Sequence, residues 1–155
     1  MLQGGLSSRR VLDLFGGSGQ LGLEAVSRGA ECAVIVDNDR AAMDAITKNV
    51  AHTKLGDRVT VSKADALSFL RTWCGKPFHL IFLDPPYGAG LVPKCLSLIL
   101  EKGLVTAGGI LVCETALEGD VFASDGVLEG KFDVLRRARY GAASITLLTP
   151  KEGVL

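Results

Sequence analysis

The feature that most constrains the fold is a regular alternation of short apolar runs with longer amphipathic segments. Apolar runs of strand length occupy residues 10–15, 32–36, 58–62, 78–83 and 109–114. The intervening segments have the composition and spacing of helices over about 19–28, 39–54, 66–73 and 92–101. Apolar strands that alternate with helices indicate a parallel sheet covered by helices on both faces.

The alternation changes in the last quarter of the chain. Residues 131–139 and 143–149 both have the pattern of strands, and Tyr140-Gly141-Ala142 joins them. Two strands with glycine in the short connection are typical of a tight hairpin. We therefore predict an α/β fold, in which the hairpin adds an antiparallel strand to an otherwise parallel sheet. With 155 residues, the chain 1–155 is expected to form a single domain.

The composition limits which classes of partner and which cellular location can be expected. The formal net charge is zero, which gives no support for a wide basic surface that would bind nucleic acid. No apolar run approaches the roughly 20 residues of a membrane span, so no membrane partner is expected. Without a CxxC pair, reduced packing residues are favoured over disulfides or metal ligands for Cys32, Cys74, Cys95 and Cys113. We expect a cytoplasmic protein without a metal site.

A glycine-rich turn, Gly16-Gly17-Ser18-Gly19-Gln20-Leu21-Gly22, follows the first predicted strand. Three of its glycines match the G-x-G-x-x-G spacing of nucleotide-binding turns, where the backbone passes close to a ligand. Asp37 then ends the second predicted strand, where a carboxylate would bind ribose hydroxyls. The alternative is a tight turn with a solvated Asp37. The combination of turn, helix and acid favours a nucleotide-type pocket.

Asp13 distinguishes between two ligands for that pocket. It lies three residues before the glycines, where it would repel the pyrophosphate of NAD. S-adenosylmethionine has no phosphate and carries an ammonium and a sulfonium, which a nearby carboxylate attracts. Asp13 therefore favours the methyl donor, unless its side chain is simply solvated.

Asp65 follows the third predicted strand and has two interpretations. It could accept a hydrogen bond from the amino group of adenine, or it could cap the next helix. The two roles are compatible.

The run Asp84-Pro85-Pro86-Tyr87 stands directly behind the fourth predicted strand. The prolines restrict the backbone, so the Asp84 side chain and the Pro85 carbonyl become fixed acceptors at the sheet edge, beside the Tyr87 ring. Acceptors for both N–H bonds of an aromatic amine localise its lone pair, and a carboxylate stabilises the positive charge that develops on nitrogen. This chemistry suits methyl transfer to an exocyclic amine; the alternative is an ordinary turn.

These motifs make the chain resemble the bacterial guanine-N2 methyltransferases of 16S ribosomal RNA. The resemblance also includes the stretch 23–30 after the glycine turn and Tyr140-Gly141 in the hairpin. It implies a Rossmann-like fold with a seven-stranded sheet, S-adenosylmethionine as donor, and small-subunit ribosomal RNA as partner. The implied donor-binding residues are Asp13, Phe15, Gly16, Gly17, Ser18, Gly19, Asp37, Asn38, Asp65, Ala66 and Asp84. The implied catalytic residues are Asp84, Pro85, Pro86 and Tyr87.

The chain departs from this family at its start. Family members carry an arginine-rich N-terminal segment, whereas the first strand here begins near residue 10 and Met1-Leu2 resembles the end of the preceding helix. We therefore expect weakened RNA binding. A solvated edge strand is the favoured interpretation of Arg136, Arg137 and Arg139, over a phosphate site. The alternatives for function are a DNA adenine-N6 methyltransferase and a nucleotide-binding module without catalysis.

Overall fold

The computed structural model describes residues 5–155, and Met1-Leu2 lies outside the described residues. The strands are β1 (Arg10–Asp13), β2 (Cys32–Asp37), β3 (Val59–Lys63), β4 (Phe78–Leu83), β5 (Val105–Ala116), β6 (Phe132–Tyr140) and β7 (Ala143–Pro150). The helices are α1 (Gln20–Ser27), α2 (Arg40–Thr53), the 3-10 helix η1 (Gly56–Arg58), α3 (Ala66–Thr72), α4 (Leu91–Glu101) and α5 (Gly126–Glu129). Within these residues no helix is long and apolar enough to cross a membrane.

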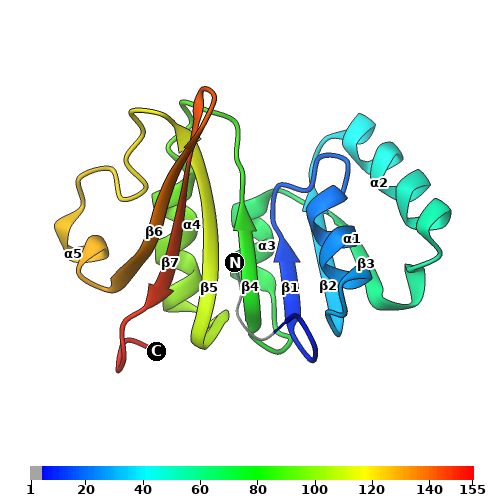
Figure 1. Ribbon diagram of the computed structural model, residues 1–155, viewed down its shortest axis with the longest axis horizontal. Helices are drawn as coiled ribbons and strands as arrows, with labels where there is room; N and C mark the ends of the chain where they lie inside the picture. Colours follow the sequence, from blue (N-terminus) through cyan, green and yellow to red (C-terminus); the bar gives the residue numbers. More distant parts are fainter. Residues whose placement is uncertain (1–4) are drawn as a thin grey trace.

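The seven strands form one sheet in the order β3-β2-β1-β4-β5-β7-β6 (Figure 1). Strands β1 to β5 are parallel to one another, and β7 runs antiparallel to both β5 and β6. The predicted α/β fold with an antiparallel hairpin strand is therefore confirmed. The chain passes outward from β1 to β3 and then returns to place β4 on the other side of β1. Parallel sheets bind ligands at such a switch point, beyond the carboxyl ends of the two central strands.

Some element boundaries differ from the prediction. Strand β1 ends at Asp13 rather than at residue 15, because the chain bends into the glycine turn, although Leu14 N–H still bonds to the Phe82 carbonyl at 3.2 Å. Strand β5 begins four residues early, at Val105, and its register against β4 shifts near Gly108, which has a φ of +73°. The short helices η1 and α5 were not predicted, because they contain too few residues to show helical periodicity.

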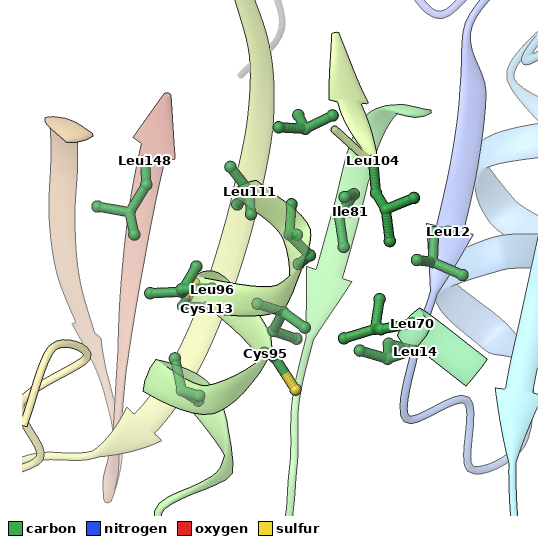
Figure 2. Packing of buried hydrophobic residues seen from close by; sticks show 14 of the residues in the cluster. Leu12, Leu14, Leu70, Ile81, Cys95, Leu96, Leu104, Leu111, Cys113 and Leu148 are labelled. Carbon is green, nitrogen blue, oxygen red and sulfur yellow. The ribbon is translucent and has the colours of Figure 1, made fainter. Parts of the chain in front are cut away.

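Helices cover both faces of the sheet. The larger core lies between the sheet and α3 and α4, where Leu12 and Ile81 from the central strands and Leu96 from α4 belong to one buried cluster (Figure 2). On the opposite face Val11, Ala33 and Leu80 pack under α1, and a small cluster around Ile35 joins α1 to α2. Neighbouring residues of one strand thus serve opposite faces, as the pleat requires. The four cysteines are free thiols. Cys95 and Cys113 are buried, as expected of packing residues, whereas Cys32 is half-buried and Cys74 is exposed, so the packing prediction is wrong for Cys74.

The glycine turn packs closely against β2. A Cβ on Gly22 would lie 2.8 Å from Cγ1 of Ile35, and a Cβ on Gly16 would overlap Cγ2 of the same side chain. Ile35 is fully buried and has little room to move. Gly19 has a φ of +80°, which glycine adopts at no steric cost, and it starts α1. The glycines therefore bring the start of α1 down onto the sheet.

We expect Gly22→Ala to destabilise the fold by about 1–3 kcal/mol, because the added methyl group must displace a buried isoleucine. The better helix propensity of alanine, about 1 kcal/mol, opposes this loss. Gly126→Ala is the control, since no atom lies within 4 Å of a Cβ there. Urea unfolding followed by circular dichroism measures both variants. Equal stability of Gly22→Ala and Gly126→Ala would show that this close contact is unimportant.

Candidate functional site

A cleft of about 610 Å³ opens beyond the carboxyl ends of the central strands. The loops after β1 and β4 and the turn between β6 and β7 gather at this edge of the sheet (Figure 1). The cleft is lined by Leu14, Phe15, Gly17, Asp37, Asn38, Asp39, Ala42, Ala64, Asp65, Ala66, Asp84, Pro85, Pro86, Tyr87 and Leu91. Most of the site residues predicted from the sequence are therefore brought together around one cavity.

Asp13 is not among the residues that line the cleft, and it is 2% exposed. Its Oδ2 accepts a hydrogen bond of 3.1 Å from the backbone N–H of Gly22, at the start of α1. Burial raises the pKa of Asp13 to about 6, and the charges of Asp84 and Asp37 add to this effect, whereas the Gly22 hydrogen bond opposes it. The solvated alternative for Asp13 is thus wrong: the carboxylate is buried next to the glycine turn.

Asp37 ends β2 and holds the glycine turn in place. One carboxylate oxygen accepts from Gly17 N–H at 2.9 Å, and the other accepts from Asp39 N–H at 2.9 Å. The side chain also lines the cleft next to Asn38. A carboxylate has about four acceptor positions, so Asp37 keeps acceptor capacity for a hydroxyl group in the cleft.

Asp65 caps α3, as one of its two predicted roles required. Its Oδ2 accepts from the backbone N–H of Ser68 at 3.0 Å and from the Ser68 hydroxyl at 3.2 Å. Asp65 is exposed and lines the cleft together with the buried Ala66. The cap fixes the carboxylate at the wall of the cavity.

The glycine turn does not present all its residues to the cleft. Phe15 and Gly17 line it, whereas Gly16 and Gly19 pack against β2 and α2. Ser18 borders a separate hollow between α1 and α2, and its carbonyl accepts from the Asn49 side chain at 2.8 Å. Ser18 therefore lies outside the cleft that Phe15 and Gly17 line.

The Asp84-Pro85-Pro86-Tyr87 run follows β4 without a break and forms one wall of the cleft. Pro85 is buried, which anchors the backbone, whereas the Asp84 side chain reaches the open edge. Tyr87 is 56% exposed, an unusual position for a large ring. The run thus combines a fixed backbone, a carboxylate and an accessible aromatic face.

Glu114 was not predicted as a site residue, but it lies beside Tyr87 and Asp84. The hydroxyl of Tyr87 donates to Glu114 Oε1 at 3.2 Å. The pKa of Asp84 is raised to about 6, first by burial and then by the charge of Glu114 and a hydrogen bond to it. The available signal was that Glu114 ends the fifth predicted strand, at the same sheet edge as Asp13, Asp37 and Asp84.

The charged side chains that line the cleft are all acidic. Asp37, Asp39, Asp65 and Asp84 line it, and none of its lining residues within 5–155 is Lys, Arg or His. No group of three or more His, Cys, Asp or Glu residues in this range is arranged to hold a metal ion. Carboxylates whose pKa is raised by burial and by neighbouring acids are stabilised by a cation. The cavity is therefore suited to a cationic ligand and unsuited to a pyrophosphate.

The arginines of the hairpin lie apart from the cleft. Arg136, Arg137 and Arg139 are exposed on β6, the edge strand, as the favoured interpretation predicted. Arg137 and Arg139 border a neighbouring hollow that Asp120 also lines.

Comparisons with known proteins place this chain in a family. The family model described as "Conserved hypothetical protein 95" matches residues 1–149. The ribosomal RNA small subunit methyltransferase D of Escherichia coli K12 is 37% identical over 109 residues, which are 70% of this chain and 54% of that protein. YlbH of Bacillus subtilis, provisionally named as an rRNA methyltransferase, is 34% identical over 140 residues, or 89% of this chain and 74% of that protein.

A solved structure agrees with this assignment. A conserved hypothetical protein of Streptococcus pyogenes superposes with a TM-score of 0.84 at 32% identity, covering 94% of this chain and 88% of that one. The sheet order and the switch-point cleft are those of a Rossmann-like methyltransferase fold. The chain spans about half the length of its E. coli relative. The chain belongs to the conserved hypothetical protein 95 family, and it is similar in sequence to the ribosomal RNA small subunit methyltransferase D of E. coli.

Proposed function

We propose that this chain transfers a methyl group from S-adenosylmethionine to the N2 amine of a guanine in 16S ribosomal RNA. The observation that carries the proposal is the Asp84-Pro85-Pro86-Tyr87 wall beside a cleft lined by acids and free of basic groups within the described residues. The E. coli relative is a ribosomal RNA small subunit methyltransferase, and the similarity to it supports ribosomal RNA over DNA as the substrate.

The donor pocket follows from the residues around the cleft. Asp37, at the end of β2, and the following Asn38 line the cleft and would bind the ribose hydroxyls. Asp65 and Ala66 line the same cleft and would border the adenine ring. The glycine turn and the buried Asp13 would hold the cationic methionine end, because opposite charges in a cleft attract strongly.

S-adenosylmethionine, when bound, supplies an electrophilic methyl group. Asp84 and the Pro85 carbonyl then accept the two N–H bonds of the target amine and hold its lone pair toward the donor cleft. Positive charge grows on the amine nitrogen during transfer, and the Asp84 carboxylate stabilises it. The Tyr87 ring stacks on the base after the base has left its own stack. The proton of the amine leaves after transfer, so no histidine is needed as a base.

Two measurements together test the proposal. Calorimetry with S-adenosylmethionine measures donor binding, and methyl transfer to 30S subunits with nucleoside analysis of the product measures the reaction. We expect binding of the donor, much weaker binding of NAD, and N2-methylguanine as product. Binding without transfer would indicate a module without catalysis, and N6-methyladenine in DNA would indicate the alternative enzyme.

We expect Asp37→Ala to weaken binding of S-adenosylmethionine by about 10- to 100-fold, because a hydrogen bond to a charged group contributes roughly 1.5–3 kcal/mol. Calorimetry measures the affinity. Asp44→Ala, which removes an exposed carboxylate of α2, is the control and should bind like the wild type. Wild-type affinity in Asp37→Ala would disprove the ribose assignment.

We expect Asp84→Ala to lower the single-turnover rate on 30S subunits by about 10²–10³-fold, by analogy with loss of a preorganised oxyanion donor. Donor affinity should change far less, because Asp84 acts on the amine. Asp84→Asn keeps one acceptor oxygen, so its single-turnover rate should lie between the rates of the wild type and of Asp84→Ala. Near-full transfer by Asp84→Ala would make this mechanism wrong.

The reaction should also depend on pH through Asp84, whose pKa is raised to about 6. Only the ionised carboxylate stabilises a positive nitrogen, so the single-turnover rate should fall about tenfold per pH unit below 6 and level off above it. The measurement uses saturating donor, because Asp13 titrates in the same range and affects binding. Asp84→Asn should flatten the profile; an unchanged profile would assign the titration to another group.

A further inference from the structure

Glu114 lies beside Asp84 at the wall of a second, smaller hollow. Leu83 pairs with Cys113 across β4 and β5, so the next residue on each strand, Asp84 and Glu114, meets at the sheet edge. This hollow of about 180 Å³ shares Pro85, Pro86 and Tyr87 with the donor cleft, and Glu114 lines it. Asp84 lines the donor cleft and Glu114 lines this hollow, so a base held at the wall that the two share would reach both carboxylates.

The position of Glu114 is fixed by its neighbours. The Tyr87 hydroxyl donates to its Oε1 at 3.2 Å, and the side chain is half-buried. The register of β4 and β5 places Glu114 next to Asp84, and the charge of Glu114 and its hydrogen bond accordingly help to raise the pKa of Asp84. One phenol hydroxyl does not fill the acceptor positions of a carboxylate, so Glu114 can accept further hydrogen bonds.

Two adjacent acceptors match one purine and mismatch the other. Beside its N2 amine, guanine carries an N1–H, which is a second donor. Beside its N6 amine, adenine carries the N1 lone pair, which is an acceptor. A carboxylate facing that lone pair would be left unpaired and repelled, whereas it would bind N1–H of guanine with a charge-assisted hydrogen bond.

We propose that Glu114 selects guanine, by accepting its N1–H while Asp84 accepts the neighbouring N2–H. This inference rests on the proposed function and adds a specificity-determining residue to it. The reading edge of a flipped base is its Watson–Crick edge, which is the edge that these two carboxylates would meet. The hydrogen bond from Tyr87 then has a role in substrate choice, since it holds Glu114 toward the base.

The test compares guanine with 2-aminopurine, which keeps the N2 amine but lacks N1–H. Short single-stranded RNAs with one such base among uridines are titrated by calorimetry in the presence of S-adenosylhomocysteine. We expect the wild type to prefer guanine by about 10- to 100-fold. Glu114→Gln should reduce this preference to near equality, because an amide can face either N1–H or a lone pair. Glu118→Gln, the same charge change on the nearby loop, should keep the preference.

A second variant and a second readout complete the test. Tyr87→Phe keeps the ring and removes the hydroxyl that holds Glu114, so it should lose part of the preference. Unchanged affinity for S-adenosylmethionine in each variant shows that the fold is intact. No guanine preference in the wild type, or full preference in Glu114→Gln, overturns the inference.

Methyl transfer to 30S subunits, measured alongside, tests the proposed function separately. Guanine preference that depends on Glu114 but comes without transfer would uphold base selection and reject the catalytic proposal. Transfer to guanine at N2 with no role for Glu114 in the preference would uphold the proposed function and reject this inference.

Discussion

The hydrogen bond from Gly22 N–H to the buried carboxylate of Asp13 is the interaction on which the site depends. It ties the first turn of α1 to the end of β1, and it is possible only because Gly22 lies against Ile35 without a Cβ. The glycine turn is then held from its other side by Asp37, through Gly17 N–H. Two carboxylates from neighbouring strands thus shape the loop: Asp37 lines the cleft, and Asp13 is buried next to the glycine turn.

Those carboxylates also set the electrostatics of the site. Asp13 and Asp84 both have a pKa raised to about 6, and each is affected by a further acid nearby. Concentrating negative charge at a switch point disfavours the empty pocket and favours a cationic ligand, which relieves the repulsion. Further along the edge, Asp84 and Glu114 form a pair that matches two adjacent N–H donors. One acidic edge therefore serves, in this proposal, to bind the donor at one end and to choose the base at the other.

Much of the fold and of the candidate site followed from local patterns. The strand and helix segments, the glycine turn, the hairpin and the cap at Asp65 were predicted within a few residues. The errors have local causes: β1 bends early into the turn, and α5 has four residues, too few for periodicity. Glu114 was missed because it acts through Tyr87, 27 positions away, and through Asp84 on a neighbouring strand.

The sequence by itself determined the elements and the chemistry of their ends, because hydrophobic period, glycine and proline act over a few residues. It placed Asp13, Asp37, Asp65 and Asp84 at strand ends. Only the tertiary structure decided which strands are neighbours, that Asp13 is buried, and that β5 brings Glu114 beside Asp84. These facts arise from hydrogen bonds between distant strands and from burial by packed helices, and neither is encoded within a local window.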